Sequence, residues 1–109
     1  MEEIVALAKI FSDPNRVKIA ALLQREGGVC VCEICDTLSL SQPLVSRHLR
    51  QMRQAGLVTA EHSGKWMVYT LSDVHKETLS CWKRALEKVV PELPPLVACS
   101  SYRGEMIEN

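Results

Sequence analysis

The chain has 109 residues, of which 47% are hydrophobic and 24% are charged. This is the composition of one globular domain, and it excludes a wholly disordered, collagen-like or low-complexity protein. No apolar run approaches the roughly 20 residues that span a bilayer, and the first residues are acidic, where a signal peptide would be basic. We therefore expect a cytoplasmic protein with no membrane partner.

Charge is unevenly distributed along this chain, whose formal net charge is zero. The section from Pro14 to Thr70 carries seven bases against four acids, and the two ends carry the balancing acids. A basic face on a neutral protein suits the binding of a polyanion without indiscriminate adhesion.

Two helices are predicted at the start of the chain. Apolar residues recur at the spacing of one helical face from Ile4 to Phe11. Asp13 can then cap a second helix. Pro14 suits the first position of that helix, because the N–H group that proline lacks would have no partner there. Gly27 ends this second helix.

A helix-turn-helix follows. A short helix is predicted over Val31–Leu38, and a fourth helix begins after Ser41, with Pro43 in its first turn. Apolar residues at i, i+4 and i+7 form the inner side of this fourth helix, while Arg47 and Arg50 project from the opposite side. Two short helices joined by a tight turn, the second one basic outside, are typical of a DNA-reading unit.

A β-hairpin and a long helix complete the predicted domain. Residues 57–61 and Trp66–Leu71 predict two strands joined by a turn at 62–65. A hairpin directly after a recognition helix is a wing, so the expected fold is mainly α with a β-hairpin wing, a winged helix-turn-helix. We expect this domain to cover 1–92 and residues 93–109 to form an extended, flexible tail.

Five cysteines are many for a small chain, and an odd number cannot pair completely within one chain. Cys30, Cys32 and Cys35 fall within six residues, which in a reducing compartment indicates metal binding or redox chemistry. Their sulfurs cannot converge on one atom from a regular helix. If all three thiols bind one ion, Cys30 must therefore lie in extended chain before the helix, or the first turn of the helix must open. Three thiolates form a soft site that suits a small trivalent ion, whereas Zn(II) would require a fourth ligand; the alternative is that these cysteines merely pack the helices.

Six residues are candidates for contact with DNA. They are Gln42, Ser46, Arg47, His48, Arg50 and Lys65. Gln42 can pair with adenine, either arginine with guanine or phosphate, and Ser46 with several partners. His48 either packs against the preceding helix or touches the DNA backbone, and Lys65 at the wing tip can reach phosphate or the minor groove.

Four segments together resemble the ArsR/SmtB family of bacterial winged-helix metalloregulatory repressors. The segments are VCVCEIC at 29–35, SQPLVSRHL at 41–49, AGLV at 55–58 and GKWMVYTL at 64–71. The thiol motif joined to the second segment resembles the arsenic- and antimony-responsive branch. The resemblance implies a homodimer that binds operator double-stranded DNA when metal-free. As(III) or Sb(III), bound by Cys30, Cys32 and Cys35, would be the inducer that releases this homodimer from the operator. The alternatives are a repressor that responds to another soft metal, such as Cd(II) or Pb(II), and a thiol redox switch.

Other positions are less informative. The family has a second metal site on its last helix, of which Asp73 and His75 match one half. Leu86 and Val89 stand where the other ligands would be needed, so we expect no metal there. Family members use C-terminal cysteines as arsenic ligands, which leaves Cys99 either a ligand or an unimportant tail thiol. No nucleophile–base pair, phosphate loop or paired carboxylates indicate an enzyme.

Overall fold

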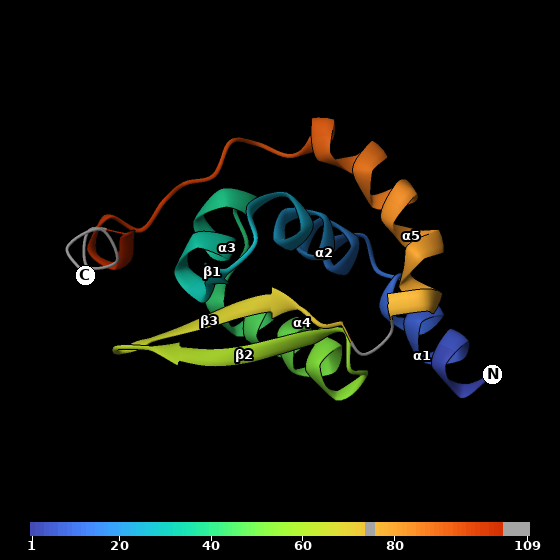
Figure 1. Ribbon diagram of the computed structural model, residues 1–109. Helices are drawn as coiled ribbons and strands as arrows, with labels where there is room; N and C mark the ends of the chain where they lie inside the picture. Colours follow the sequence, from blue (N-terminus) through green and yellow to red (C-terminus); the bar gives the residue numbers. More distant parts are fainter. Residues whose placement is uncertain (74–75, 104–109) are drawn as a thin grey trace.

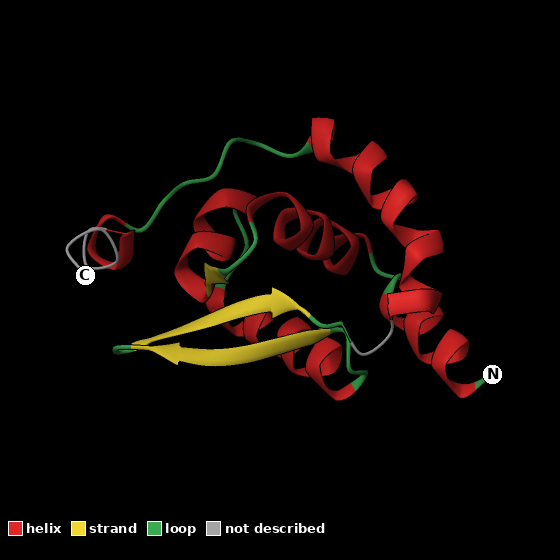
Figure 2. Ribbon diagram, in the orientation of Figure 1, coloured by secondary structure: helices red, strands yellow, loops and turns green. Residues whose placement is uncertain are grey.

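The computed structural model describes residues 1–73 and 76–103, and its elements form a winged helix-turn-helix (Figures 1 and 2). In chain order they are α1 (Glu2–Ile10), α2 (Pro14–Glu26), β1 (Val29–Cys30), α3 (Val31–Leu38), α4 (Gln42–Gln54), β2 (Val58–Ser63), β3 (Trp66–Leu71), α5 (Lys76–Val89) and the 3-10 helix η1 (Val90–Glu92). The expected fold class is confirmed. None of the described helices is long and apolar enough to cross a membrane.

The second helix begins where its sequence signals place it. The Asp13 carboxylate accepts hydrogen bonds from the backbone N–H groups of Asn15 at 2.8 Å and Arg16 at 3.4 Å. Pro14 occupies the first helical position, and Gly27 ends the helix with a φ of 77°. These contacts satisfy N–H groups that otherwise have no partner within the helix.

The sheet has three antiparallel strands in the order β1-β3-β2. The strand β2 runs two residues further than predicted, because it pairs with β3 as far as Ser63 opposite Trp66. This leaves a two-residue loop in which Gly64 adopts a φ of 62°. The short strand β1 was not predicted. It lies against β3 because Gly28 has no Cβ, which would stand 2.9 Å from a methyl carbon of Val68.

The core lies between the helix-turn-helix and the sheet, and α1 and α5 pack together at the end of the molecule away from the wing tip (Figure 1). Fully buried side chains include Leu22, Ile34 and Leu49 from three successive helices. At the far end, the rings of Phe11 and Trp82 stack with centroids 4.6 Å apart.

After η1 the chain runs back along the molecule toward α3 (Figure 1). Residues 94–99 have no regular structure and residues 100–103 are helical. Tyr102 is buried, and its ring centroid lies 5.7 Å from that of Trp66 at the start of β3. We call residues 97–103 the C-terminal strap, because this segment contacts both α3 and the sheet.

The Asp13 cap yields a stability prediction. Asp13→Ala should lower the free energy of unfolding by about 0.5–2 kcal/mol, because two backbone N–H groups lose their acceptor. Asp13→Asn should retain most of the stability, since asparagine is an equally good cap. Denaturant unfolding followed by circular dichroism measures both, and equal losses in the two variants would contradict a capping role.

Candidate metal centre and nucleic-acid interface

Two thiols meet at the junction between β1 and α3. Cys30 is the residue before the helix and has extended backbone, with φ −87° and ψ 164°. Its Sγ lies 3.0 Å from the Sγ of Cys32 in the first turn of α3. Because Cys30 lies outside the helix, the 200° separation that a regular helix imposes on i and i+2 does not apply. Of the two conformations considered, extended chain at Cys30 is the one observed.

The third sulfur in this group belongs to the strap. The Sγ atoms of Cys30, Cys32 and Cys99 all lie within 4.8 Å of one another. Over residues 1–73 and 76–103 this is the one group of three potential metal ligands so close together. Cys35 is half-buried on α3 and is not a member, and Cys81 is exposed on α5.

The carboxylate of Glu33 organises the surroundings of these thiols. Its side chain is fully buried, and Oε1 accepts hydrogen bonds from the Cys30 N–H at 3.1 Å and from Nη2 of Arg103 at 2.9 Å. The other oxygen, Oε2, accepts from the Cys99 N–H at 3.1 Å and from Nε of Arg103 at 2.7 Å. One side chain therefore holds the backbone of two of the three cysteines in the group.

Burial and hydrogen bonding set the protonation of these groups. Burial raises the pKa of the Cys30, Cys32 and Cys35 thiols, because desolvation disfavours a thiolate. Burial would also raise the pKa of the Glu33 carboxyl, but the Arg103 guanidinium and the two N–H donors outweigh it and lower that pKa. Glu33 is thus an ionised, paired carboxylate, whereas the raised pKa values keep the Cys30 and Cys32 thiols protonated near neutral pH.

The predicted DNA-contacting residues are divided between the surface and the interior. Gln42, Arg47 and Arg50 on α4 are exposed, and Ser46 is half-buried. Lys65 is exposed in the wing loop, with its Nζ 4.9 Å from the ring centroid of Trp66. His48, by contrast, is only 6% exposed.

His48 lies where α2 and α4 pack together. Its Nδ1 is 3.4 Å from Nη1 of Arg16, and its Nε2 is buried with no hydrogen-bond partner among the described residues. Arg16 also donates to the carbonyl oxygens of Ile10 at 2.8 Å and Lys9 at 3.0 Å, and to Gln51 Oε1 at 2.7 Å. This guanidinium connects the end of α1 to α4, so it helps to fix the orientation of α4 in the domain.

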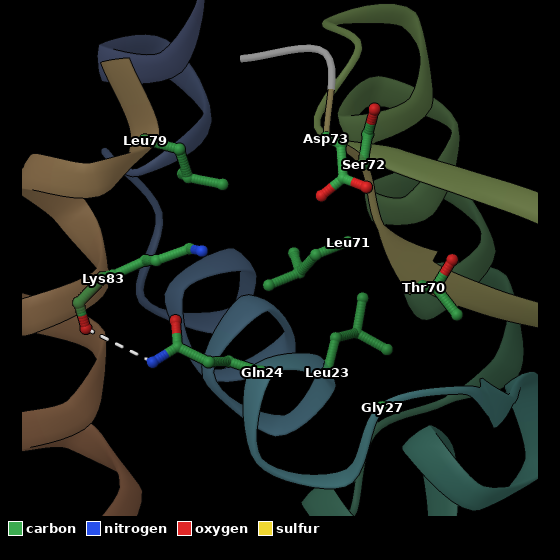
Figure 3. A pocket seen from close by; sticks show the side chains of 9 residues that line it. All are labelled: Leu23, Gln24, Gly27, Thr70, Leu71, Ser72, Asp73, Leu79 and Lys83. Carbon is green, nitrogen blue, oxygen red and sulfur yellow. Dashed lines mark hydrogen bonds between the residues drawn. The ribbon is translucent and has the colours of Figure 1, made fainter. Parts of the chain in front are cut away.

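A separate hollow of about 250 Å³ lies between α2, the end of β3 and α5 (Figure 3). Leu23, Leu71 and Leu79 line it, and Gln24 at its edge donates a hydrogen bond to the Lys83 carbonyl at 3.3 Å. Asp73 borders the hollow, whereas His75 lies outside the described residues. No thiol lines this hollow, so it is distinct from the cysteine group.

Comparisons with known proteins place the chain in a family. The model of bacterial regulatory proteins of the arsR family matches residues 13–60, which include α2, α3 and α4. The structure of HlyU from Vibrio cholerae N16961 superposes with a TM-score of 0.67 and 30% sequence identity, covering 76% of this chain and 90% of that one. The chain belongs to the arsR family. The matched segment is therefore that of a helix-turn-helix regulatory protein.

Relatives within the arsR family carry different names. The arsenical resistance operon repressor of Escherichia coli K12 is 44% identical over 68 residues, which are 62% of this chain and 58% of that protein. A homologue of the cadmium resistance regulatory protein CadC from Staphylococcus aureus is 35% identical over 77 residues, 71% of this chain and 64% of that protein. The chain thus spans less than two thirds of either relative. The first relative supports the arsenic branch of the resemblance.

The burial of His48 yields a prediction for stability against pH. Burial lowers the pKa of this imidazole; Asp13 opposes that shift and Arg16 reinforces it. Below about pH 6.5, the value of a free imidazole, the unfolded state binds more protons than the folded state. The free energy of unfolding should therefore fall with falling pH, by at most about 1.4 kcal/mol per pH unit from this group.

The variant His48→Gln should remove this part of the pH dependence. His62→Gln, which alters an exposed side chain on β2, is the matched control and should keep the wild-type slope. Denaturant unfolding between pH 5 and pH 8 compares the three proteins. A wild-type slope in the His48→Gln protein would show that His48 does not titrate in this range.

Proposed function

We propose that this arsR-family chain is a homodimeric repressor that binds operator DNA when metal-free and is released by As(III) or Sb(III). The observation that carries the proposal is the position of the thiols. Cys30 belongs to β1, which pairs with β3 of the wing, and Cys32 belongs to α3, the first helix of the helix-turn-helix. An ion held by both would act directly on the joint between the two DNA-reading elements.

The proposed DNA contacts come from α4 and the wing loop. Gln42, Arg47 and Arg50 are exposed on α4, which is capped at Ser41, and their donors suit base edges and phosphates. Lys65 would follow the phosphate backbone or enter the minor groove from the wing. His48 is the weakest member of the predicted set, because its contact with DNA would require it to leave the interior.

The proposed dimer uses α1 and α5. The winged helix has its own core, yet Ile4 and Val5 on α1 are 60% and 44% exposed. Apolar side chains on a terminal helix favour burial against a second copy. A two-fold dimer would place two α4 helices about one DNA turn, roughly 34–36 Å, apart on a pseudo-palindromic operator.

The charge of the complex and the number of thiol ligands favour a trivalent ion as the inducer. Three thiolates around As(III) or Sb(III) form a neutral complex, whereas the same ligands around Cd(II) would leave a negative charge in a half-buried site beside the Glu33 carboxylate. Cys30, Cys32 and Cys35 are the ligands predicted from the sequence. Cys35 lies outside the sulfur group, so it would join only if the first turn of α3 opened.

Such an opening would couple the ion to DNA. A ligand shifts an equilibrium only by its different affinities for two conformations. A coupling of about 1–3 kcal/mol, typical of allosteric proteins, would weaken the operator complex roughly 5–150-fold.

Operator binding should depend on the exposed side of α4. Arg47→Ala should weaken binding to a duplex carrying the operator by about 1–3 kcal/mol if the guanidinium pairs with a base. Arg25→Ala is the matched control, because that guanidinium is engaged by Glu26 and by the Pro94 carbonyl. Fluorescence anisotropy at fixed salt measures both affinities. Equal effects would contradict the assignment of α4 as the reading helix.

Release by the inducer is tested by titrating the operator complex with As(III), Sb(III), Cd(II) and an oxidant in separate experiments. We expect As(III) and Sb(III) to release wild-type protein under full reduction, and Cys32→Ser to bind DNA normally but not respond. Cys81→Ser should respond like wild type. Release by the oxidant alone would indicate a redox switch, and release by Cd(II) alone would indicate a sensor of a divalent metal.

A further inference from the structure

We propose that Cys99, rather than Cys35, supplies the third thiolate of the site, and that the C-terminal strap closes over the ion. This inference rests on the proposed function and identifies the ligand set through which it operates. Cys99 already lies with Cys30 and Cys32 in one group of sulfurs, all within 4.8 Å of one another. No opening of α3 is needed for these three to bind one ion.

The strap is held by contacts independent of the sulfurs. At its start, the Val97 N–H donates to Thr37 Oγ1 at 2.9 Å. At its end, Arg103 donates two hydrogen bonds to the Glu33 carboxylate, and its Nη2 also lies 3.3 Å from the Gly28 carbonyl. The buried ring of Tyr102 packs against Trp66. These contacts place Cys99 in advance, so that binding an ion does not have to order this segment.

The binding step balances without any further reactant. Arsenous acid, As(OH)₃, exchanges its three hydroxyl groups for the three sulfurs: three S–H and three As–O bonds break, three As–S bonds form, and each thiol proton leaves with a hydroxyl as water. Arsenic remains trivalent, and the product carries no net charge.

The geometry also suggests how the ion acts on DNA binding. The three ligands belong to β1, α3 and the segment that follows α5. A bound ion would join the sheet, the helix-turn-helix and the chain leaving the proposed dimer helix in the strap-docked conformation. Release of DNA follows when the operator complex prefers a different relation between these parts.

The ligand set is tested by titrating the reduced full chain with arsenite, in a phosphine reductant that does not compete as a thiol. The near-ultraviolet absorbance of As–S bonds gives the affinity and the number of sulfurs per chain. Cys99→Ser should weaken arsenite binding roughly tenfold or more, because one of three linked ligands is lost, and should reduce the absorbance per bound ion. Cys35→Ser and the exposed-thiol control Cys81→Ser should both match wild type.

The outcomes separate this inference from the proposed function. Wild-type affinity in Cys99→Ser, or a loss in Cys35→Ser as large as that in Cys99→Ser, overturns the ligand set even if arsenite still releases the operator. If wild type binds arsenite as described but the operator complex is not released, the ligand set stands and the proposed function fails.

Arg103 is assigned as a positioning residue. Arg103→Gln should weaken arsenite binding about tenfold, as is common for groups that orient ligands. The same substitution in a Cys99→Ser background should have no further effect on arsenite binding, because no strap ligand remains to be positioned. An equal effect in both backgrounds would show that Arg103 acts on the fold generally and overturn the positioning role.

Discussion

A carboxylate removed from water is stable only when hydrogen-bond donors surround it, and Glu33 meets this condition with donors from three parts of the chain. The N–H of Cys30 comes from the residue before α3, the N–H of Cys99 from the strap, and the guanidinium from Arg103. Burial of an unpaired charge would cost several kcal/mol. Undocking of the strap would therefore expose the Glu33 carboxylate to water or leave it buried without these donors. The path of the chain after η1 and the proximity of the three sulfurs both depend on this buried carboxylate.

The same residue has a local role at the start of α3. Glu33 is the third residue of the helix, and its acceptance of the Cys30 N–H is half of a capping box. A capping acid at this position is ordinarily exposed to solvent at a helix end. Here the strap covers it, so a local helix signal also serves as the anchor of a segment far along the chain. The strap thus covers the cysteine group through a residue that any short helix might carry.

The two sides of α4 have separate tasks. The inner side holds Val45, Leu49 and Met52 in the core, with His48 beside Arg16. The guanidinium of Arg16 connects α4 to the carbonyl end of α1, and Phe11, directly after α1, stacks on Trp82 of α5. A continuous series of contacts therefore runs from α5 through the end of α1 and Arg16 to α4.

Much of this protein could be predicted from its sequence, because the signals act over a few residues. The cap at Asp13, the proline at the start of α2, the bounds of α3 and the strand Trp66–Leu71 all follow from interactions within one or two turns or from the alternation of a hairpin. The exposed bases of α4 followed in the same way from helical periodicity. The pairing of β1 with β3 did not, since a two-residue strand has too few residues to show a pattern.

Only the tertiary structure decided where Cys99 and Arg103 lie. The contacts that bring them to Glu33 span 66 and 70 residues, and no local rule relates positions so far apart. Viewed in sequence, Cys99 is one thiol in a segment after several prolines, and Cys35 is the obvious neighbour of Cys30 and Cys32. In the folded structure Cys99, and not Cys35, groups with Cys30 and Cys32. The regular helix carries Cys35 away from this pair, while the returning chain brings Cys99 toward it. Local hydrogen bonding determines the helices, whereas the need to pair one buried charge determines which sulfurs meet.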